Sequence, residues 1–248
     1  LSYIDKYRNN NPYAWRLKSN FFIKYCNIYF LVKYRIFFIK KPFFISTFIT
    51  VSDKIIFMSI TDEGHYGPKQ LNLLKTVWGE GFLSPGGTDE IDEVVKGIDI
   101  TDKSILDIGC GCGGAAIHLI KSHGAKSVLG IDIEPLVVKR AEELAARQGL
   151  SNLTQFRCVK PGPLNIPDES VDLVFSKEVF LHISNKENLM KDIHRVLKPS
   201  GLVVASDWMR MDDNPPSLLM QEYIDAEGLD MYMCSLKHYE KLLEKVGF

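Results

Sequence analysis

Two aspartates flank a glycine-rich segment, and their spacing suits a nucleoside that carries a cationic tail. Residues 106–114 read LDIGCGCGG, with Asp107 two residues before Gly109 and Asp132 a further 23 residues along the chain. Glycines let the backbone turn tightly and let a ligand approach the N-terminus of a following helix. A carboxylate at position 107 repels a pyrophosphate but attracts an ammonium group. An acid at position 132 can accept hydrogen bonds from ribose hydroxyls.

These preferences together describe S-adenosyl-L-methionine, which joins a nucleoside to a cationic amino acid. Two alternatives stay open at this point. Dinucleotide-binding proteins use a similar glycine-rich turn, so an NAD-dependent enzyme is the next interpretation. Glycines also serve strand–turn–helix folding by themselves, and Asp132 can simply cap the helix that follows it. The register of Asp107, the glycines and Asp132 favours S-adenosyl-L-methionine as the cofactor.

The elements that must position these residues alternate between strand and helix from Met58 onward. Apolar runs predict strands at 104–108, 127–131, 154–159, 171–176 and 202–206. Helical spacing predicts helices at 69–78, 88–96, 115–122, 135–148, 185–197, 216–226 and 235–246, with Thr88 as the cap of the second helix. Residues 198–201 (KPSG) are predicted as a turn before the last strand. The alternation predicts an α/β, Rossmann-like doubly wound fold: a mostly parallel sheet with helices on both faces.

Four segments resemble motifs of a known family. Residues 106–114 resemble motif I of class I S-adenosylmethionine-dependent methyltransferases, and residues 197–202 (LKPSGL) resemble their post-core turn. Residues 78–87 (WGEGFLSPGG) and 176–184 (SKEVFLHIS) resemble two motifs of phosphoethanolamine N-methyltransferases, namely the loop at the entrance of the site and the segment after the fourth strand. The resemblance runs from Tyr66 to Phe248. It implies an enzyme that moves a methyl group from S-adenosyl-L-methionine to a small-molecule acceptor.

The resemblance also implies a role for individual residues. The implied cofactor site consists of Leu83, Ser84, Asp107, Gly109, Gly111, Asp132, Ile133 and Lys160. The implied acceptor site has Glu178 facing the substrate amine, with Trp208 and Tyr223 lining the pocket. His182 matches the catalytic histidine of the family, and Tyr66 matches its partner near the lid.

An amine acceptor needs a general base because it is mostly protonated at neutral pH, and histidine is the side chain most often used as one, so His182 is the candidate base. Tyr66 on a lid would close the site and hold the imidazole. Without the resemblance, a packed histidine at a strand-to-helix junction is the preferred interpretation of His182.

Several positions depart from the family pattern. Lys160 stands where many relatives have an acid that meets the adenine amino group. Leu74, Leu229 and Glu227 stand where the family has tyrosines and an arginine around the phosphobase. A phosphate is bound best by Arg or Lys, so the sequence favours a small amine over phosphoethanolamine. Three alternatives to N-methylation remain: C- or O-methylation of a lipid or quinone, a non-catalytic S-adenosylmethionine-binding protein, and the NAD-dependent enzyme.

The first sixty residues have a different composition from the rest. They carry ten Lys/Arg against two acids, sixteen of the 27 aromatic residues, one alanine and no glycine. The longest charge-free run has eleven residues, which is too short for a spanning helix of roughly 17–25 residues. We therefore expect residues 1–57 to be a basic aromatic leader, either non-native translated upstream sequence or disordered, and residues 58–248 to be the methyltransferase domain. A basic helix at a membrane surface is the minority interpretation.

The cysteine content and the net charge indicate the cellular location and the class of partner. The five cysteines form no disulfide framework, which favours a reducing cytoplasm. Cys110 and Cys112 are expected as small loop residues, and no metal site is assigned. The net charge of −1 gives no sign of nucleic-acid binding, and no stable membrane insertion is expected. The chain ends at Phe248, where class I methyltransferases begin an antiparallel hairpin, so we expect a C-terminal truncation with an exposed sheet edge. The oligomeric state is left open.

Overall fold

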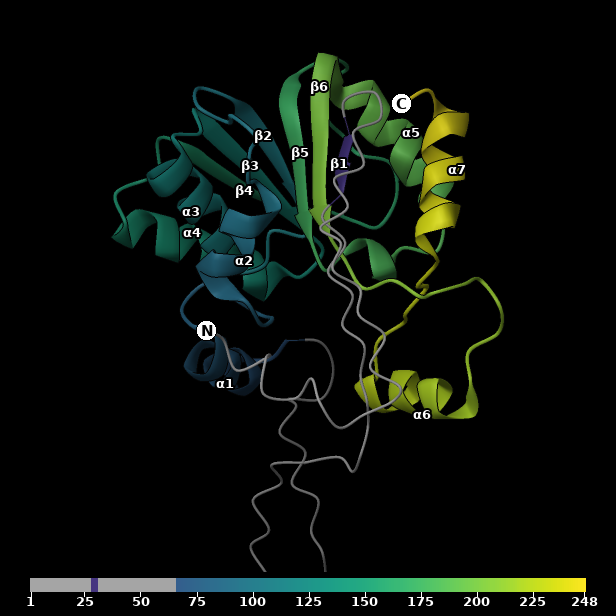
Figure 1. Cartoon of the computed structure of the whole chain (residues 1–248). Helices are drawn as coiled ribbons and strands as arrows, with labels where there is room; N and C mark the ends of the chain where they lie inside the picture. Colours follow the sequence, from purple (N-terminus) through teal and green to yellow (C-terminus); the bar gives the residue numbers. More distant parts are fainter. Residues whose placement is uncertain (1–27, 31–65) are drawn as a thin grey trace, which may run out of the picture.

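The computed structural model describes residues 28–30 and 66–248, which form one twisted sheet covered by helices (Figure 1). The strands are β1 (Ile28–Phe30), β2 (Ser104–Ile108), β3 (Ser127–Asp132), β4 (Thr154–Cys158), β5 (Val171–Lys177) and β6 (Leu197–Ser206). Their spatial order is β1-β6-β5-β2-β3-β4, and every neighbouring pair is parallel. The predicted α/β, doubly wound class is confirmed.

The order of the strands reverses beside β2. From β2 the chain proceeds outward to β3 and β4, and it then returns to β5 on the other side of β2 before reaching β6. Ligands of open α/β sheets bind in the crevice that such a reversal opens at the carboxyl ends of the strands. The loops that follow β2 and β5 are therefore the expected walls of a binding site.

Helices cover both faces of the sheet. They are α1 (Pro68–Trp78), α2 (Gly87–Val94), α3 (Gly114–His123), α4 (Pro135–Arg147), α5 (Lys186–Val196), α6 (Leu218–Glu227) and α7 (Leu236–Val246). One buried cluster joins α2, α3 and α4 to Ile105 and Phe175, and the other joins α5 and α7 to Leu106 and Val174. Successive side chains of a strand point to opposite faces of the sheet, so neighbouring residues of β2 and of β5 pack into different clusters. In Figure 1, α1 and α6 lie beyond the end of the sheet at which β5 and β6 finish.

Two local predictions were wrong. Thr88 does not cap α2: the helix starts at Gly87, its N-cap is Gly86 with φ 99°, and no side chain caps it. Only glycine adopts that backbone readily, and a Cβ on Gly86 would lie 2.1 Å from the carboxylate of Glu90. The predicted turn at 198–201 is a bulge inside β6, because Val171 pairs with Leu197 while Leu173 pairs with Leu202.

The strand β1 lies on the free edge of β6, where Ile28–Phe30 pair with residues 203–205. The other residues of the predicted leader, 1–27 and 31–57, lie outside the described part of the chain, so the leader prediction remains a prediction. Among the residues that the structure describes, no helix is both long enough and apolar enough to cross a membrane.

Candidate cofactor and acceptor site

The glycine-rich segment forms a loop between β2 and α3 at the strand-order reversal. Gly109 and Gly111 have φ values of 73° and 53°, and Gly113, the N-cap of α3, has φ 84°. A Cβ on Gly109 would lie 2.1 Å from a methyl group of Val179, the residue that follows Glu178. The loop therefore requires glycine twice over, for its left-handed backbone and for its close approach to the segment after β5.

Asp107 lies near the end of β2 and is almost fully buried, with 1% of its surface exposed. Its Oδ2 atom has no hydrogen-bond partner among the described residues. Burial raises the pKa of this carboxyl to about 8, and the nearby carboxylate of Asp132 contributes to the increase. A buried acceptor without a partner is costly, so this position is prepared for a donor that the protein itself does not supply.

Asp132 ends β3 and faces the glycine loop. Its Oδ2 accepts a hydrogen bond from Gly111 N at 3.0 Å, and its Oδ1 accepts one from Glu134 N at 3.1 Å. Burial raises the pKa of Asp132, while these backbone donors oppose the increase. The N-cap of α4 is Glu134, not Asp132, so a capping role does not explain this carboxylate. Each oxygen keeps a lone pair that can accept a further hydroxyl.

The other two predicted cofactor residues on this side are solvent-exposed. Ile133 follows Asp132 with 53% of its surface exposed, and Lys160 is exposed two residues beyond β4. The backbone of Val159 donates to Asp132 O at 2.8 Å, which holds the start of the Lys160 segment beside the end of β3. Both residues therefore lie beside Asp132 along the rim of the sheet.

The lid loop, residues 79–87, packs directly onto the glycine loop. Gly114 N donates to Gly81 O at 3.1 Å, and a Cβ on Gly81 would lie 2.7 Å from Gly114 Cα. Leu83 lies over Gly111, because a Cβ built on Gly111 would lie 3.3 Å from the Leu83 side chain. Leu83 thus lies against the glycine loop, and its contact with the cofactor stays a prediction.

Ser84 is held by Lys177, the last residue of β5. The Lys177 ammonium donates to Ser84 Oγ at 2.6 Å and to Pro85 O at 2.9 Å. Its charge is balanced by Glu90, whose Oε2 lies 3.3 Å away as an ion pair without hydrogen-bond geometry, and by Glu178, whose Oε1 lies 3.5 Å away. The other oxygen of Glu90 accepts from Ser206 Oγ at 3.0 Å. Because both charged side chains are nearly inaccessible, this pair fixes the lid loop to the sheet.

Tyr66 lies over the same region. It packs with Leu71, Leu83, Cys112 and Val137 in an apolar cluster. Burial and the negative charges of Asp132, Glu134 and Glu178, together with Cys112, raise the pKa of Tyr66 to about 12.

A cleft of about 180 Å³ opens between α1 and α4, and its walls include Gly81, Leu83 and Cys112. Neither Asp107 nor Asp132 lines it. The cleft is therefore next to the glycine loop, whereas Asp107 is buried and does not line it.

His182 ends the short 3-10 helix η2 (Phe180–His182), which follows directly after Glu178 and Val179. Its Nδ1 atom lies 2.7 Å from Asp230 O, which accepts the hydrogen bond. The predicted partner Tyr66 makes no hydrogen bond to His182 in the described structure, so the backbone carbonyl of Asp230 is the group that orients the imidazole. With the proton on Nδ1, the Nε2 atom keeps its lone pair for a base role.

Lys186 holds this 3-10 helix in place through two hydrogen bonds. Its ammonium is buried and donates to Phe180 O at 3.0 Å and to Ile183 O at 2.8 Å. Burial lowers the pKa of Lys186, and the charges of Cys234 and Asp207 oppose the decrease. Tyr232 N also donates to Leu181 O at 2.6 Å. The position of His182 is thus set by backbone contacts on both sides.

The acceptor side contains two carboxylates, Glu178 and Asp207. Glu178 has φ 55° and donates through its backbone N to Ser206 O at 2.7 Å. Asp207 follows β6, is 8% exposed, and has one oxygen without a hydrogen-bond partner. Burial raises the pKa of Asp207 to about 7, and the Glu178 charge adds to the effect. Trp208 N donates to Asp207 Oδ1 at 2.8 Å, while Tyr223 lies half-buried on α6.

Comparison with known proteins identifies this arrangement. A model of the methyltransferase domain family matches residues 106–205, from the glycine loop to the end of β6. A solved phosphoethanolamine N-methyltransferase 2 from Haemonchus contortus, in complex with phosphomonomethylethanolamine and S-adenosylhomocysteine, superposes with a TM-score of 0.65 at 26% identity. Residues 106–205 thus form a methyltransferase domain, and its fold is that of class I S-adenosylmethionine-dependent methyltransferases. That structure covers 72% of this chain, and the chain covers 41% of it.

Two further relatives bear on the methyltransferase domain. Phosphoethanolamine N-methyltransferase 1 of Arabidopsis thaliana is 31% identical over 193 residues, which make up 77% of this chain and 38% of that protein. A putative sarcosine dimethylglycine methyltransferase from Galdieria sulphuraria has a TM-score of 0.61 at 26% identity, with 71% of each chain covered. The chain spans less than two fifths of the Arabidopsis relative, so the activity of the whole protein is a matter for proposal.

The residues of the methyltransferase domain fit S-adenosyl-L-methionine. The unpartnered Oδ2 of Asp107 suits an ammonium group, and the remaining lone pairs of Asp132 suit ribose hydroxyls. An NAD pyrophosphate would meet the buried carboxylate of Asp107, which disfavours the dinucleotide alternative.

Sequence reasoning missed Lys177, Glu90 and Asp207. Lys177 and Asp207 each stand at the carboxyl end of a parallel strand, which was an available signal. Glu90 carried no such signal, because it lies on a helix 87 residues before Lys177 and meets it only in the folded chain.

Proposed function

We propose that this methyltransferase domain transfers the methyl group of S-adenosyl-L-methionine to the nitrogen of a small amine or phosphobase such as phosphoethanolamine. The observation that carries the proposal is the buried, unpartnered carboxylate of Asp107 beside the Asp132-bound glycine loop. The names of the relatives support the acceptor class, since two of them are phosphoethanolamine N-methyltransferases.

In this proposal the cofactor is held between the glycine loop and the lid. Asp107 pairs with the methionine ammonium, Asp132 accepts from the ribose, and Leu83 and Ser84 cover the cofactor from above. Ile133 and Lys160 border the adenine end on the rim. When bound, S-adenosyl-L-methionine supplies a methyl group that is activated by a positively charged sulfur.

The acceptor side then attracts and deprotonates a cation. Glu178 is paired with Lys177 at 3.5 Å, and the unpartnered oxygen of Asp207 is the acceptor on this side that favours an ammonium. His182 takes the proton from the nitrogen through Nε2, because Nδ1 donates to Asp230 O. Tyr66, Trp208 and Tyr223 exclude water, which would otherwise compete for these groups.

A small amine is favoured over a phosphorylated one within this class. The two buried lysines near the site already have partners. Lys177 forms an ion pair with Glu90 and a hydrogen bond with the lid loop, and Lys186 donates to the carbonyls of the 3-10 helix. A phosphate needs cations that are available to it. The proposal therefore ranks free ethanolamine-like and glycine-like amines first and phosphoethanolamine second.

The proposal includes a small molecule as the partner and the cytoplasm as the location. Support for the location comes from the four cysteines in the described residues, Cys110, Cys112, Cys158 and Cys234, all of which are free thiols. Cys110 and Cys112 are buried in the glycine loop, in keeping with a packing role.

A labelled-methyl assay tests the proposal. The full chain is incubated with labelled S-adenosyl-L-methionine and, separately, with ethanolamine, phosphoethanolamine, glycine and a quinol acceptor. Label in an amine product supports N-methylation, whereas label only in the quinol supports C- or O-methylation. Calorimetry with S-adenosylhomocysteine and NAD is run in parallel. Cofactor binding without any product points to a non-catalytic binding protein, and NAD binding alone overturns the cofactor assignment.

A further inference from the structure

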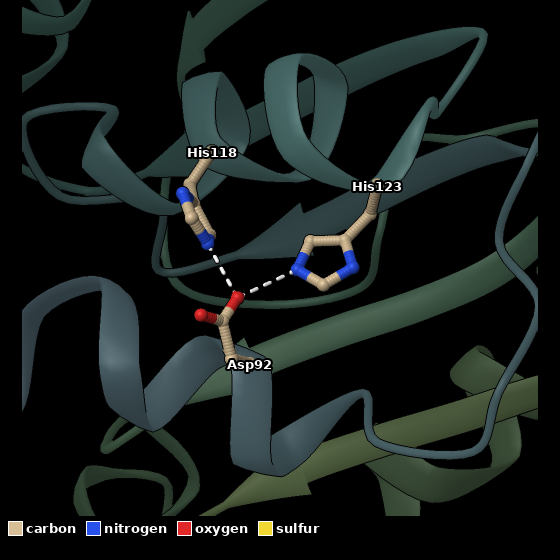
Figure 2. A group of neighbouring side chains, drawn as sticks. All are labelled: Asp92, His118 and His123. Carbon is tan, nitrogen blue, oxygen red and sulfur yellow. Dashed lines mark hydrogen bonds and ion pairs between the residues drawn. The ribbon is translucent and has the colours of Figure 1, made fainter.

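Three side chains from two helices meet on the face of the molecule formed by α2 and α3 (Figure 2). His118 Nε2 lies 2.6 Å from Asp92 Oδ1, and His123 Nε2 lies 2.8 Å from the same oxygen. Asp92 belongs to α2, while both histidines belong to α3. None of the three takes part in the proposed cofactor or acceptor site.

The arrangement has the features of a metal-ligand set. Each residue offers one ligand atom, and the three atoms lie within 4.8 Å of one another. The imidazole rings stand edge to face with their centroids 5.3 Å apart, so both Nε2 atoms face Asp92 without a clash. Ser122 Oγ lies 3.2 Å from His118 Nδ1. A hydrogen bond to the second ring nitrogen is how proteins orient a histidine ligand.

Exposure of the three side chains leaves room for an ion. The histidines are mostly enclosed, with 14% and 24% of their side chains exposed, whereas the Asp92 side chain is 51% exposed. A tetrahedral zinc site holds its ligand atoms about 3.3 Å apart. Asp92 therefore needs to retreat by less than about 1 Å from the two rings, a movement that its exposed carboxylate can make by rotation.

We propose that Asp92, His118 and His123 bind a divalent ion of the zinc class at the α2–α3 surface. Two imidazole nitrogens and one carboxylate oxygen match the ligand preference of Zn²⁺ and neighbouring transition metals. Mg²⁺ prefers oxygen ligands and keeps its waters, so it is a poor occupant. The ion replaces the two imidazole protons that are otherwise shared with Asp92, and a water completes the fourth position.

Such an ion would join two helices that frame the cofactor site. The helix α2 carries Glu90, which anchors the lid loop through Lys177, and α3 begins at Gly114 in the glycine loop. Binding therefore stabilises the domain at a point that is remote from the chemistry. This inference does not depend on the acceptor or on methyl transfer.

Calorimetry and thermal unfolding of the full chain test the site with Zn²⁺ as the probe and Mg²⁺ as the negative control. We expect one equivalent of Zn²⁺ and, at a hundredfold excess over Kd, a Tm increase of about 5 °C. Asp92→Asn preserves an oxygen that can accept from both imidazoles but removes the charged ligand, so it should keep the metal-free Tm and lose the Zn²⁺-dependent increase. The double variant His118→Asn/His123→Asn should lose the same equivalent.

The matched control is His238→Asn, which removes an exposed histidine that is paired with a single aspartate. It should leave the Zn²⁺ response unchanged. Co²⁺ then distinguishes this site from a thiol such as the exposed Cys158, because imidazole and carboxylate ligands give visible d–d bands without a thiolate charge-transfer band. A thiolate band, equal Zn²⁺ binding by the double variant, or no bound equivalent in the parent chain would each overturn the proposal.

Discussion

Lys177 Nζ lies 2.6 Å from Ser84 Oγ, so the last residue of β5 holds a loop that precedes it by more than ninety positions. The same ammonium forms an ion pair with Glu90 at 3.3 Å, and both side chains are at most 8% exposed. The lid loop therefore does not cover the glycine loop by apolar packing alone. It is fixed to the sheet by a buried charge pair that also connects it to α2.

Removal of the Lys177 charge alone should lower the free energy of unfolding more than removal of the Lys177 and Glu90 charges together. Lys177→Met leaves Glu90 buried without a counter-charge, which typically costs about 3–5 kcal/mol. Lys177→Met combined with Glu90→Leu should recover most of that stability in urea unfolding. Neither variant restores the anchor of Ser84, so both should bind S-adenosylhomocysteine more weakly. Equal urea midpoints for the single and double variants would contradict the charge-pair explanation.

Cofactor binding should release a proton at neutral pH. The pKa of Asp107 is about 8 in the folded chain against an ordinary value of 3.8. The folded state thus holds the extra proton between about pH 4 and pH 8, and its stability falls as pH rises through that window. An ammonium placed against Asp107 favours the ionised form. Calorimetry of S-adenosylhomocysteine binding at pH 7, in buffers of different ionisation enthalpy, should detect this proton, and Asp107→Asn should abolish it.

The two aspartates should recognise different parts of the cofactor. Asp107→Asn should weaken S-adenosylhomocysteine but leave methylthioadenosine, which lacks the amino-acid tail, almost unchanged. Asp132→Ala should weaken both ligands by roughly 10–100-fold, because a charged hydrogen-bond acceptor is lost. Titration of each variant with both ligands measures the difference. If Asp107→Asn weakened both ligands alike, its pairing with the tail would be wrong.

His182→Ala should lower turnover by about 10²–10⁴-fold without a change in cofactor affinity. The reason is that its Nε2 is the proposed proton acceptor, while Asp230 O occupies Nδ1. The comparison variant is His194→Ala, which removes a histidine that packs edge to face against Phe248 at a centroid distance of 5.0 Å. It should retain turnover. Full activity of His182→Ala would remove the histidine from the mechanism.

Gly109→Ala should destabilise the domain far more than Gly149→Ala. Both glycines have φ near 70°, so both substitutions carry a backbone cost of about 1–2 kcal/mol. Only at Gly109 does the added Cβ meet a neighbour, at 2.1 Å from Val179, whereas nothing lies within 4 Å at Gly149. The additional overpacking cost is about 1–3 kcal/mol. Val179→Ala in the Gly109→Ala background should recover part of it, as judged by thermal unfolding.

The sequence by itself determined the parts of this protein that depend on local patterns. Alternating apolar runs placed the five strands β2 to β6 and the helices between them, and the register of Asp107, Gly109 and Asp132 predicted the cofactor loop. Local patterns failed at two places. Helix α2 starts on the left-handed Gly86 and not after Thr88, and residues 198–201 continue β6 as a bulge because the ladder with β5 resumes at Leu202.

Tertiary structure alone decided the pairings between distant residues. Lys177 with Glu90, His182 with Asp230 O, and Asp92 with His118 and His123 join positions that are separated by 26 to 87 residues. Whether these groups come close enough to interact depends on how the helices pack on the sheet. The spacing of residues along the sequence does not determine that packing. Burial also follows from that packing, and it turns Asp107 and Asp207 from ordinary acids into carboxyls with raised pKa values.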